Sequence, residues 1–385
     1  MNICILSHRY PYKDNMVHVF VKKLVDEWAK MGHNCIVLSP LSMTHVLLGK
    51  EKKAPISDEY VVIPGKSVRV YRPRYYSIPR VRLFGIDISS YMQQRCVERT
   101  LKAVGISIDV IYCHFYITIP AVWHFASENK IPLFVATGES SMAPMLKPCK
   151  SFSIEKMKES LYGVVAVSSK NKKEAVELGY AKEHDTIVFP NGTDLKVFYK
   201  RDKIECRERL GFPSDSFIII CVGQFVERKG QKRILKAIDI LNNNKIKTVF
   251  IGKGDDQFEH DSIIYKGSIN NNDLPIFLNA ADVFVLPTQG EGCCNAIIEA
   301  LACGLPIISS NRPFNYDVLN ESNSILVEPD SIEEISEAID KLYNDEHLRF
   351  SMSQRSLEMG QHLSIEKRAN NILAFMLNRI LESSK

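Results

Sequence analysis

The stretch VFVLPTQGEGCCNAIIEALACGLPIISS, residues 283–310, combines two apolar runs, a polar loop rich in glycine and a helical pattern. The apolar runs at 283–288 and 306–310 predict strands, and the segment 294–303 between them predicts a helix. Gly292 precedes that helix and Gly304 follows it, as expected at helix boundaries. Two apolar strands joined by a helix are typical of a parallel sheet.

The same alternation of short apolar runs and helical patterns extends over the whole chain. Because the runs are continuously apolar, we expect helices to cover both faces of each sheet. The fold class predicted is α/β, with two doubly wound Rossmann-like domains. The other predicted strands are residues 2–7, 34–39, 68–72, 109–114, 133–138, 163–168, 186–190, 217–223, 247–252, 262–267 and 324–329.

The segment between the two sets of strands is the best linker candidate, because it opens with the turn sequence PNG at 190–192 and continues with a polar stretch. We expect an N-terminal domain over residues 1–197 and a C-terminal domain over 198–364. A C-terminal helix at about 365–385 is expected to pack back on the first domain. The carboxyl ends of both sheets are expected to face a central cleft that holds the site.

The composition is that of a globular protein, since 45% of the 385 residues are hydrophobic and 24% are charged. No window approaches the roughly 18 apolar residues of a membrane-spanning helix, so a cytoplasmic location is expected. The net charge of +4 is uneven: residues 1–190 carry 26 Lys and Arg against 17 Asp and Glu, or +9, and the remainder carries −5. The two halves are expected to bind different partners.

The ten cysteines argue against a metal or redox site. No two have the C-x2-C spacing of zinc or thioredoxin sites, and most lie in apolar runs, where a thiol packs as a small hydrophobic group. Cys293 and Cys294 are interpreted as packing or helix-start residues, and a redox role is kept as the alternative. No metal ligand set is predicted.

The loop VGQFVERKG, residues 222–230, has the composition of a phosphate-binding turn. Gly223 ends a predicted strand, and Lys229 begins the next helix, where unpaired backbone N–H groups and the helix dipole favour an anion. Arg228 and Lys229 add positive charge for a diphosphate. The same residues also fit a solvated basic helix start, which remains open on this loop alone.

Two glutamates flank the predicted start of the helix 294–303. Glu291 lies in the preceding loop and Glu299 inside the helix, roughly 10 Å further along its axis. This separation suits the two ends of an extended ligand better than one shared proton. A buried Glu299 would need partners, which two vicinal ribose hydroxyls could supply. Either glutamate alone would also fit a residue that faces solvent.

Four segments together resemble, in order and spacing, the signatures of family 4 retaining glycosyltransferases, which have the GT-B fold. EGCCNAIIEALACGLPIISS (291–310) matches the family's E-x7-E motif. The other three segments are VGQFVERKG, VFPNGTDLKVF (188–198) and AADVFVLP (280–287). Residues 7–40 are also similar to the family's opening strand and helix, so the likeness covers essentially the whole chain.

The resemblance implies a role for each matching residue. Lys229 would bind the diphosphate of a nucleotide-sugar donor, Glu299 its ribose, and Glu291 the hydroxyls of the transferred sugar, so Glu291 is a candidate catalytic residue. The leaving diphosphate would assist deprotonation of the acceptor, so no cofactor, metal or protein nucleophile is expected. The remaining candidates for donor binding are Gly223, Arg228, Gly267, Gly292, Cys293, Cys294 and Asn295.

Three loops depart from the family pattern. Gln224 replaces an arginine, the segment DNMVHV at 14–19 replaces a glycine pair, and FVATGES at 134–140 lacks a histidine. Glu139 in the last of these loops is a second catalytic candidate, as a sugar or acceptor contact, or else a loop-capping residue. His114, at the end of a predicted strand, would face the cleft or lie in the core.

These observations predict a retaining glycosyltransferase that acts in cell-surface polysaccharide or glycolipid assembly. An inactive nucleotide-sugar-binding scaffold is the alternative that the departures at 14–19 and 137–140 favour, and a GT-B epimerase or phosphorylase is a further one. A dehydrogenase is disfavoured because no G-x-G-x-x-G follows the first strand of either half. A glycosidase is disfavoured because its paired carboxylates stand roughly 5 to 9.5 Å apart.

The segment KSVRVYRPRYYSIPRVRLF, residues 66–84, interleaves cations with aromatic residues and contains no acidic residue. Such a segment suits an anionic lipid surface, so peripheral membrane contact and a lipid-linked glycan acceptor are hypotheses. An edge strand whose arginines deter aggregation fits equally well. Nucleic acid is not expected, because no recognised binding module accompanies the segment. Its cations are Lys66, Arg69, Arg72, Arg74, Arg80 and Arg82.

Overall fold

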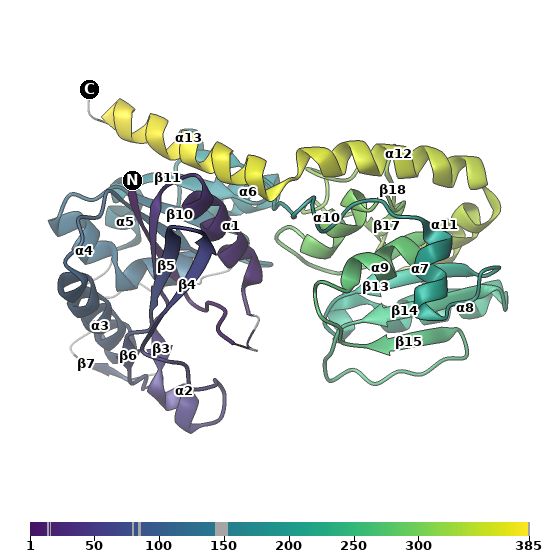
Figure 1. Ribbon diagram of the computed structural model, residues 1–385, viewed down its shortest axis with the longest axis horizontal. Helices are drawn as coiled ribbons and strands as arrows, with labels where there is room; N and C mark the ends of the chain where they lie inside the picture. The colour runs from purple at the N-terminus through teal and green to yellow at the C-terminus, as the bar shows by residue number, and fades with distance from the viewer. Residues whose placement is uncertain (14, 16, 79–80, 84–85, 143–152, 384–385) are drawn as a thin grey trace. The chain divides into compact units, whose positions relative to one another are not determined.

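The computed structural model describes residues 1–385 except 14, 16, 79–80, 84–85, 143–152 and 384–385 (Figure 1). The chain forms two compact units. The N-terminal unit comprises Met1–Phe189 together with Arg368–Lys385, and the C-terminal unit comprises Pro190–Lys367. Each unit contains one large, mainly parallel sheet, so the predicted fold class is confirmed.

The C-terminal unit is built on a six-stranded parallel sheet. The chain order reverses between β13 and β16, so the carboxyl ends of these two strands flank the switch point where doubly wound sheets bind ligands. In spatial order the strands are β15 (Ile263–Gly267), β14 (Ile246–Ile251), β13 (Phe217–Val222), β16 (Val283–Leu286), β17 (Ile307–Ser310) and β18 (Ser324–Val327).

Helices cover both faces of this sheet, which explains why β13, with the sequence FIIICV, is almost fully buried. Two further helices, α7 and α12, pack against α9 and α10. The helices of this unit are α7 (Lys203–Leu210), α8 (Gln231–Leu241), α9 (Leu274–Ala280), α10 (Asn295–Ala302), α11 (Ile332–Asn344) and α12 (Glu346–His362), and η3 is a short 3-10 turn at Glu227–Lys229.

The N-terminal unit contains an eight-stranded sheet that is parallel except for its edge pair β4 and β5. In spatial order the strands are β12 (Thr186–Val188), β11 (Leu161–Ala166), β10 (Leu133–Thr137), β9 (Val110–His114), β1 (Asn2–Ser7), β2 (Asn34–Leu38), β5 (Lys66–Tyr71) and β4 (Ser57–Ile63). Its helices include α1 (Val19–Lys30), α2 (Met43–Leu47), α3 (Ile88–Val104), α4 (Trp123–Glu128), α5 (Ile154–Ser160) and α6 (Ser169–Glu177).

Two short strand pairs lie outside this sheet. They are β3 (Leu41–Ser42) with β6 (Arg74–Tyr75), and β7 (Arg82–Leu83) with β8 (Ile86–Asp87). None of the helices in the described part of the chain is both long and apolar enough to span a membrane.

The division between the units falls at Pro190, before the expected boundary near residue 197. Phe189 N donates to Ala166 O at 2.8 Å and so continues the register of β12. Thr193 already belongs to the other unit, because it exchanges backbone hydrogen bonds of 2.9 Å with Leu363 and Ile365. At Gly192 a side chain would collide with the backbone of Ser364.

Helix α13 (Ile365–Ser383, yellow in Figure 1) returns to the N-terminal unit. Trp28 Nε1 donates to Ala369 O at 3.1 Å, and Arg379 Nε donates to Tyr162 O at 2.9 Å. Phe375 packs against Gly163. A side chain at position 163 would collide with the Phe375 ring. The helix therefore contributes the buried side chains of Ala369, Ile372, Leu373 and Met376 to the core of the unit that begins the chain.

Candidate functional site

Glycines end three neighbouring strands of the C-terminal sheet. Gly223 follows β13, Gly252 follows β14, and Gly267 ends β15. Gly223 N donates to Ile251 O, and Gly252 N donates to Gly267 O, both at 2.9 Å. A side chain at Gly252 would collide with the carbonyl of Gly223, so the backbones of these loops are in direct contact. Gly223 and Gly267, both predicted to bind the donor, thus lie at the same carboxyl edge of the C-terminal sheet.

The loops after β13 and β16 bring three charged side chains together. Lys229 Nζ lies 2.6 Å from Glu291 Oε1, and Arg228 Nη1 lies 2.8 Å from the same oxygen. Thr288 Oγ1 also donates to it, at 3.1 Å. The side chain of Lys229 is 10% exposed and that of Glu291 15%, whereas that of Arg228 is 38% exposed. The cluster is thus a largely buried ion pair with a cation at its rim.

Both members of this ion pair are charged at neutral pH. Burial alone would raise the pKa of the Glu291 carboxyl, but Lys229 and Arg228 outweigh burial and hold that pKa below its ordinary value. Burial alone would lower the pKa of the Lys229 ammonium, but Cys294 and Glu291 outweigh burial and raise it. The site therefore offers a fixed carboxylate and a fixed ammonium side by side.

Helix α10 begins beside this cluster and has no side-chain cap. Its N-cap residue, Cys294, has an extended backbone, and the Cys294 side chain makes no capping hydrogen bond. The Cys294 thiol is buried, and burial raises its pKa, so it packs as an apolar group. Asn191 Nδ2 donates to Cys293 O at 3.1 Å and fixes the preceding loop. Free N–H groups at a helix start favour an anion.

Glu299 lies on α10, one helical turn before Cys303, and its side chain is half-buried. Burial raises the pKa of the Cys303 thiol to about 12, and the nearby Glu299 carboxylate adds to this rise. Asn295 and Gly292 lie at the start of the same helix and in the loop before it. The structure thus places every predicted donor-binding residue in the C-terminal unit, at the end of β15 or on the loops and helices that follow β13 and β16.

Glu139, the second catalytic candidate, lies in the N-terminal unit directly after β10. Its Oε1 accepts a hydrogen bond from Tyr116 N at 3.1 Å, and its Oε2 accepts from Thr137 Oγ1 at 2.6 Å and from Gly138 N at 2.8 Å. These contacts join the loop after β10 to the 3-10 turn η1 (Tyr116–Ala121) that follows β9. They favour the loop-capping alternative.

A cluster of histidine and phenylalanine rings at the carboxyl ends of β1 and β9 was missed by the sequence analysis. The ring of His114 lies 4.6 Å from that of Phe115 and 5.2 Å from that of Phe20. His18 contacts Phe20 and Phe115 at 5.4 and 5.7 Å. The sequence contained two separate signals, His114 at the end of a predicted strand and the departure at 14–19 that contains His18, but it did not indicate that the two lie in one cluster. His114 is buried, as the core alternative expected.

The two histidines of this cluster are neutral. Burial, followed by the neighbouring His8, lowers the pKa of His18 to about 4, and burial also holds the pKa of His114 well below its ordinary value. Both Nδ1 atoms are buried without a hydrogen-bond partner in the part of the chain that is described. His18 has φ 52°, so it adopts the left-handed conformation that glycine usually provides.

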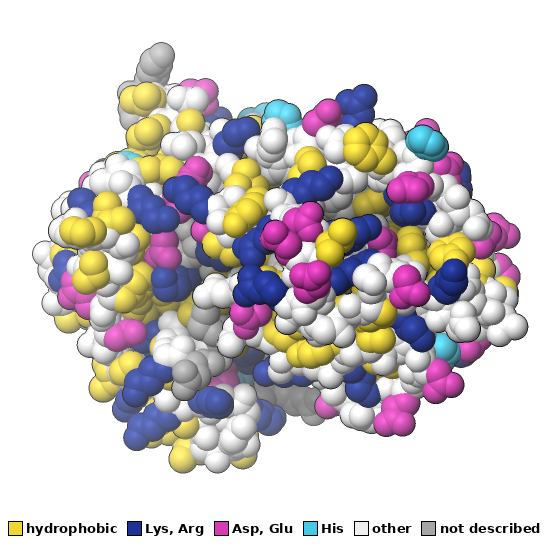
Figure 2. Space-filling view, turned by 45° about the vertical axis from the view of Figure 1, so that its right-hand side comes forward, with side chains coloured by type: hydrophobic (Ala, Val, Ile, Leu, Met, Phe, Trp, Pro, Cys, Tyr) yellow, Lys and Arg dark blue, Asp and Glu magenta, His cyan; other side chains and the backbone are white. Residues whose placement is uncertain are grey.

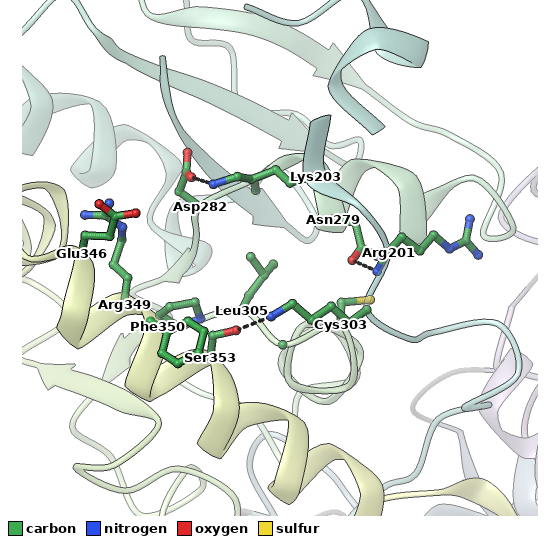
Figure 3. A pocket seen from close by; sticks show the side chains of 14 residues that line it. Arg201, Lys203, Asn279, Asp282, Cys303, Leu305, Glu346, Arg349, Phe350 and Ser353 are labelled. Carbon is green, nitrogen blue, oxygen red and sulfur yellow. Dashed lines mark hydrogen bonds and ion pairs between the residues drawn. The ribbon is translucent and has the colours of Figure 1, made fainter. Parts of the chain in front are cut away.

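A separate cavity of about 220 Å³ in the C-terminal unit lies at the other edge of the sheet (Figure 3). Asp282 precedes β16 and Pro306 precedes β17, so this cavity opens at the amino ends of these strands. Its lysines contact neighbours, since Lys203 Nζ lies 2.8 Å from Asp282 Oδ1 and Lys200 Nζ donates to Ser353 Oγ at 3.2 Å. It is unrelated to the donor-binding candidates.

The described residues contain no group of three or more His, Cys, Asp or Glu arranged to hold a metal ion.

Comparisons with known proteins point to one class. Residues 202–359 match the family described as glycosyl transferases group 1. TuaC of Bacillus subtilis (strain 168), a glycosyltransferase named for teichuronic acid biosynthesis, is 27% identical over 339 residues, which cover 85% of each chain. The UDP-Gal:alpha-D-GlcNAc-diphosphoundecaprenol alpha-1,3-galactosyltransferase of Escherichia coli is 29% identical over 234 residues, which cover 57% of this chain and 60% of that enzyme.

Solved structures share the fold over the full length of the chain. The sucrose-phosphate synthase of Thermosynechococcus elongatus superposes with a TM-score of 0.76 at 20% identity, and 100% of both chains is covered. The shared fold is GT-B.

Proposed function

The chain is a glycosyltransferase of group 1 with the GT-B fold, and we propose that it is a retaining enzyme of family 4. It moves a sugar from a nucleotide diphosphate sugar to an acceptor hydroxyl. The observation that carries this proposal is the contact of Lys229 with Glu291 at the switch point of the C-terminal sheet, beside the uncapped start of α10. A diphosphate needs the Lys229 ammonium and the N–H groups at the start of α10. The hydroxyls of a sugar need the Glu291 carboxylate.

The proposed donor position follows from the charges. The diphosphate lies against Lys229, Arg228 and the first N–H groups of α10, where fixed cations and helix N–H groups attract it. The Glu291 carboxylate accepts hydrogen bonds from hydroxyls of the transferred sugar. Glu299 accepts two hydrogen bonds from the ribose, for which its half-buried position on α10 leaves it accessible.

The transfer step uses positioning and electrostatic stabilisation. The bond between the anomeric carbon and the diphosphate oxygen breaks, and a bond from that carbon to the acceptor oxygen forms on the same face of the sugar. The acceptor proton passes to the leaving diphosphate, whose developing charge Lys229 and the helix N–H groups stabilise. Glu139 acts as a positioning residue that holds its loop.

The acceptor is proposed to be a sugar or a lipid-linked glycan in the assembly of a cell-surface polysaccharide. The names of both relatives support this, because one refers to teichuronic acid biosynthesis and the other to a diphosphoundecaprenol acceptor. The fold and the cluster at Lys229 are compatible with several donors, so the nucleotide is left to experiment.

We further propose that the protein acts at the inner face of a membrane and contacts anionic lipid. The residues that carry this contact differ from those expected. Arg72 is only 2% exposed and is ion-paired with Asp58, so it does not face a membrane. Arg80 lies outside the described residues, and so does the side chain of Arg82.

The proposed lipid-facing surface combines α2 with residues 74–78 and 81–83. Leu47 and Leu48 are 76% and 61% exposed, and the basic residues 50, 52 and 53 follow them. Ser42 Oγ lies 2.7 Å from Ser77 Oγ, which joins the start of α2 to residues 74–78. Figure 2 shows Lys and Arg side chains (dark blue) gathered on the lower left lobe, where Figure 1 places α2. The exposed apolar side chains of residues 74–78 and 81–83 are Tyr76, Ile78, Val81 and Leu83.

A screen of UDP-, GDP- and ADP-sugars tests the enzymatic proposal. The correct donor, at 100 times its dissociation constant, adds about 2.7 kcal/mol to the free energy of unfolding, which a thermal shift detects. With that donor and an acceptor, the product has the donor's anomeric configuration by NMR. Inversion would contradict retention, and donor binding with no transfer to any acceptor would favour the inactive scaffold.

A further inference from the structure

A cavity of about 230 Å³ lies in the N-terminal unit, at the carboxyl edge of its sheet. His8 follows β1, Ser39 follows β2 and Arg72 follows β5, and these strands are neighbours. The carboxyl edge of a doubly wound sheet is its ligand-binding edge. The residues that line the cavity are His8, Arg9, Tyr10, Tyr12, Asn15, Val17, Ser39, Pro40, Leu41, Lys50, Glu51, Lys52, Ala54 and Arg72.

The wall of this cavity is fixed by polar contacts between the loops that form it. The Arg72 guanidinium is paired with Asp58, donates to Pro11 O at 3.2 Å and lies 5.1 Å from the ring centre of Tyr12. Tyr12 OH donates to Lys53 O at 3.1 Å, which holds the segment 50–53 against the loop after β1. A wall that is held in this way can present charges at constant positions.

The lining carries more cations than anions. The Arg72 charge is compensated by Asp58, and Arg9 Nη2 lies 3.3 Å from Glu51 Oε1. Lys50 and Lys52 line the same cavity, and neither is ion-paired with a carboxylate among the residues the structure describes. Within the described part of the chain, these two positive charges therefore have no counter-charge. His8 adds none at neutral pH, because burial and then Arg9 lower its pKa.

We propose that this cavity binds an acidic group of the acceptor, a phosphate or a carboxylate, through Lys50, Lys52 and Arg9. The proposal rests on the proposed glycosyl transfer, because all donor-binding candidates lie in the other unit and leave this cavity for the acceptor. Arg9 can exchange its contact with Glu51 for the ligand, since its side chain is 46% exposed. Tyr12 and His8 supply hydrogen-bonding groups beside the anion.

The test compares two anionic probes with their neutral counterparts by calorimetry, at low salt and with UDP, GDP and ADP present in excess to occupy the donor site. Geranyl diphosphate is compared with geraniol, and methyl glucuronide with methyl glucoside. We expect one anionic probe to bind at least tenfold more tightly than its counterpart. Tighter binding of geranyl diphosphate would indicate that the acceptor group is the phosphate of a lipid carrier. Tighter binding of methyl glucuronide would indicate that it is the carboxylate of an acidic sugar.

The variants separate this cavity from general attraction to basic surfaces. Lys50→Gln with Lys52→Gln is expected to weaken the anionic probe about tenfold or more, because two charge-assisted contacts are lost. Lys53→Gln is the matched control, since Lys53 is equally exposed but its side chain is not in the lining. Binding of neither anion above its counterpart, or equal losses in the double variant and the control, would overturn the proposal.

The same experiment keeps the two proposals apart. The affinity for UDP, GDP and ADP is measured in the wild type and in every variant. Absence of binding of UDP and also of GDP and ADP would count against the proposed function, whereas the difference between the double variant and the control still decides whether this cavity binds an anion.

Discussion

Lys229 Nζ lies 2.6 Å from Glu291 Oε1, so the residue proposed for the donor diphosphate contacts the residue proposed for the donor sugar. The contact joins the loop after β13 to the loop after β16. A bound diphosphate would contact the Lys229 ammonium, which also contacts Glu291. A bound sugar would contact the Glu291 carboxylate, which also contacts Lys229. Ligand binding and the ion pair are therefore linked, and a change to either residue alters both.

Glu291→Gln is expected to weaken binding of the nucleotide sugar at least tenfold, because the sugar hydroxyls lose a charged acceptor. Binding of the free nucleotide diphosphate is expected to be unchanged or tighter, since Lys229 is released from its partner. Calorimetry with both ligands measures the difference. Glu227→Gln, which alters an exposed carboxylate in the loop that carries Lys229, is the control. Equal losses for both ligands would assign Glu291 to the nucleotide instead.

Glu299→Ala is expected to weaken binding of the nucleotide diphosphate and the nucleotide sugar alike. The ribose loses hydrogen bonds to a charged acceptor, a loss of about 1.5 to 3 kcal/mol. Equilibrium binding of both ligands tests this, with Glu337→Ala on the exposed face of α11 as the control. If the Glu299 variant binds both ligands with unchanged affinity, Glu299 is not part of the donor site.

The ion pair predicts a pH dependence of stability. The folded-state pKa of Glu291 is lowered, so its contribution is present above the ordinary value of 4.5 and is lost as the pH falls through the lower folded value. The folded-state pKa of Lys229 is raised, so its contribution is present below the ordinary value of 10.5 and is lost as the pH rises through the higher folded value.

Thermal unfolding of the wild type and of Glu291→Gln, measured at a series of pH values, checks this. The difference in Tm is expected to form a plateau at neutral pH and to shrink in acid. A difference that grows as the pH falls below 4.5 would contradict the assigned direction.

Turnover is expected to be independent of divalent metal. Lys229, Arg228 and the N–H groups of α10 already place positive charge at the proposed diphosphate position. The rate in excess EDTA should equal that in magnesium or manganese. Loss of activity in chelator, restored by either ion, would show that these groups do not suffice.

Membrane contact is expected to depend on α2. The wild type should sediment with anionic liposomes at low salt and less so with neutral liposomes or at high salt, as cationic surfaces do. Leu47→Ser with Leu48→Ser should reduce this binding, because two exposed apolar side chains are lost. Ile240→Ser, which alters an exposed apolar residue of α8, is the matched control. No preference for anionic lipid would refute the contact.

The parallel core could be predicted because each buried strand is a continuous apolar run, as in FIIICV of β13. The strand β4 could not be predicted in the same way. Its residues alternate between exposed and half-buried, since it pairs antiparallel at the sheet edge and only one of its faces is covered. Its sequence SDEYVVI therefore lacks the continuous apolar pattern.

The residues of the candidate site were proposed from the sequence and stay predictions, and the contacts between them could not be predicted from the sequence. The loop sequence identified Lys229 and the motif identified Glu291, but their pairing depends on β13 lying beside β16. Spacing alone could not decide whether Glu139 contacts a ligand or caps a loop. The structure shows that Tyr116 N, Thr137 Oγ1 and Gly138 N donate hydrogen bonds to its carboxylate. The sequence indicated that Arg72 is a surface cation, but in the structure it forms an ion pair with Asp58.

Because the chain enters the C-terminal unit at Pro190 and leaves it after Lys367, the first unit is completed last during synthesis. A ribosome that adds about 5 to 20 residues per second needs roughly 10 to 35 s to make residues 190–367. During this interval Trp28 lacks the carbonyl of Ala369, and the surface at Gly163 lacks the ring of Phe375. The second unit can fold while the first still exposes part of its apolar surface, which makes the nascent N-terminal half a substrate for chaperones.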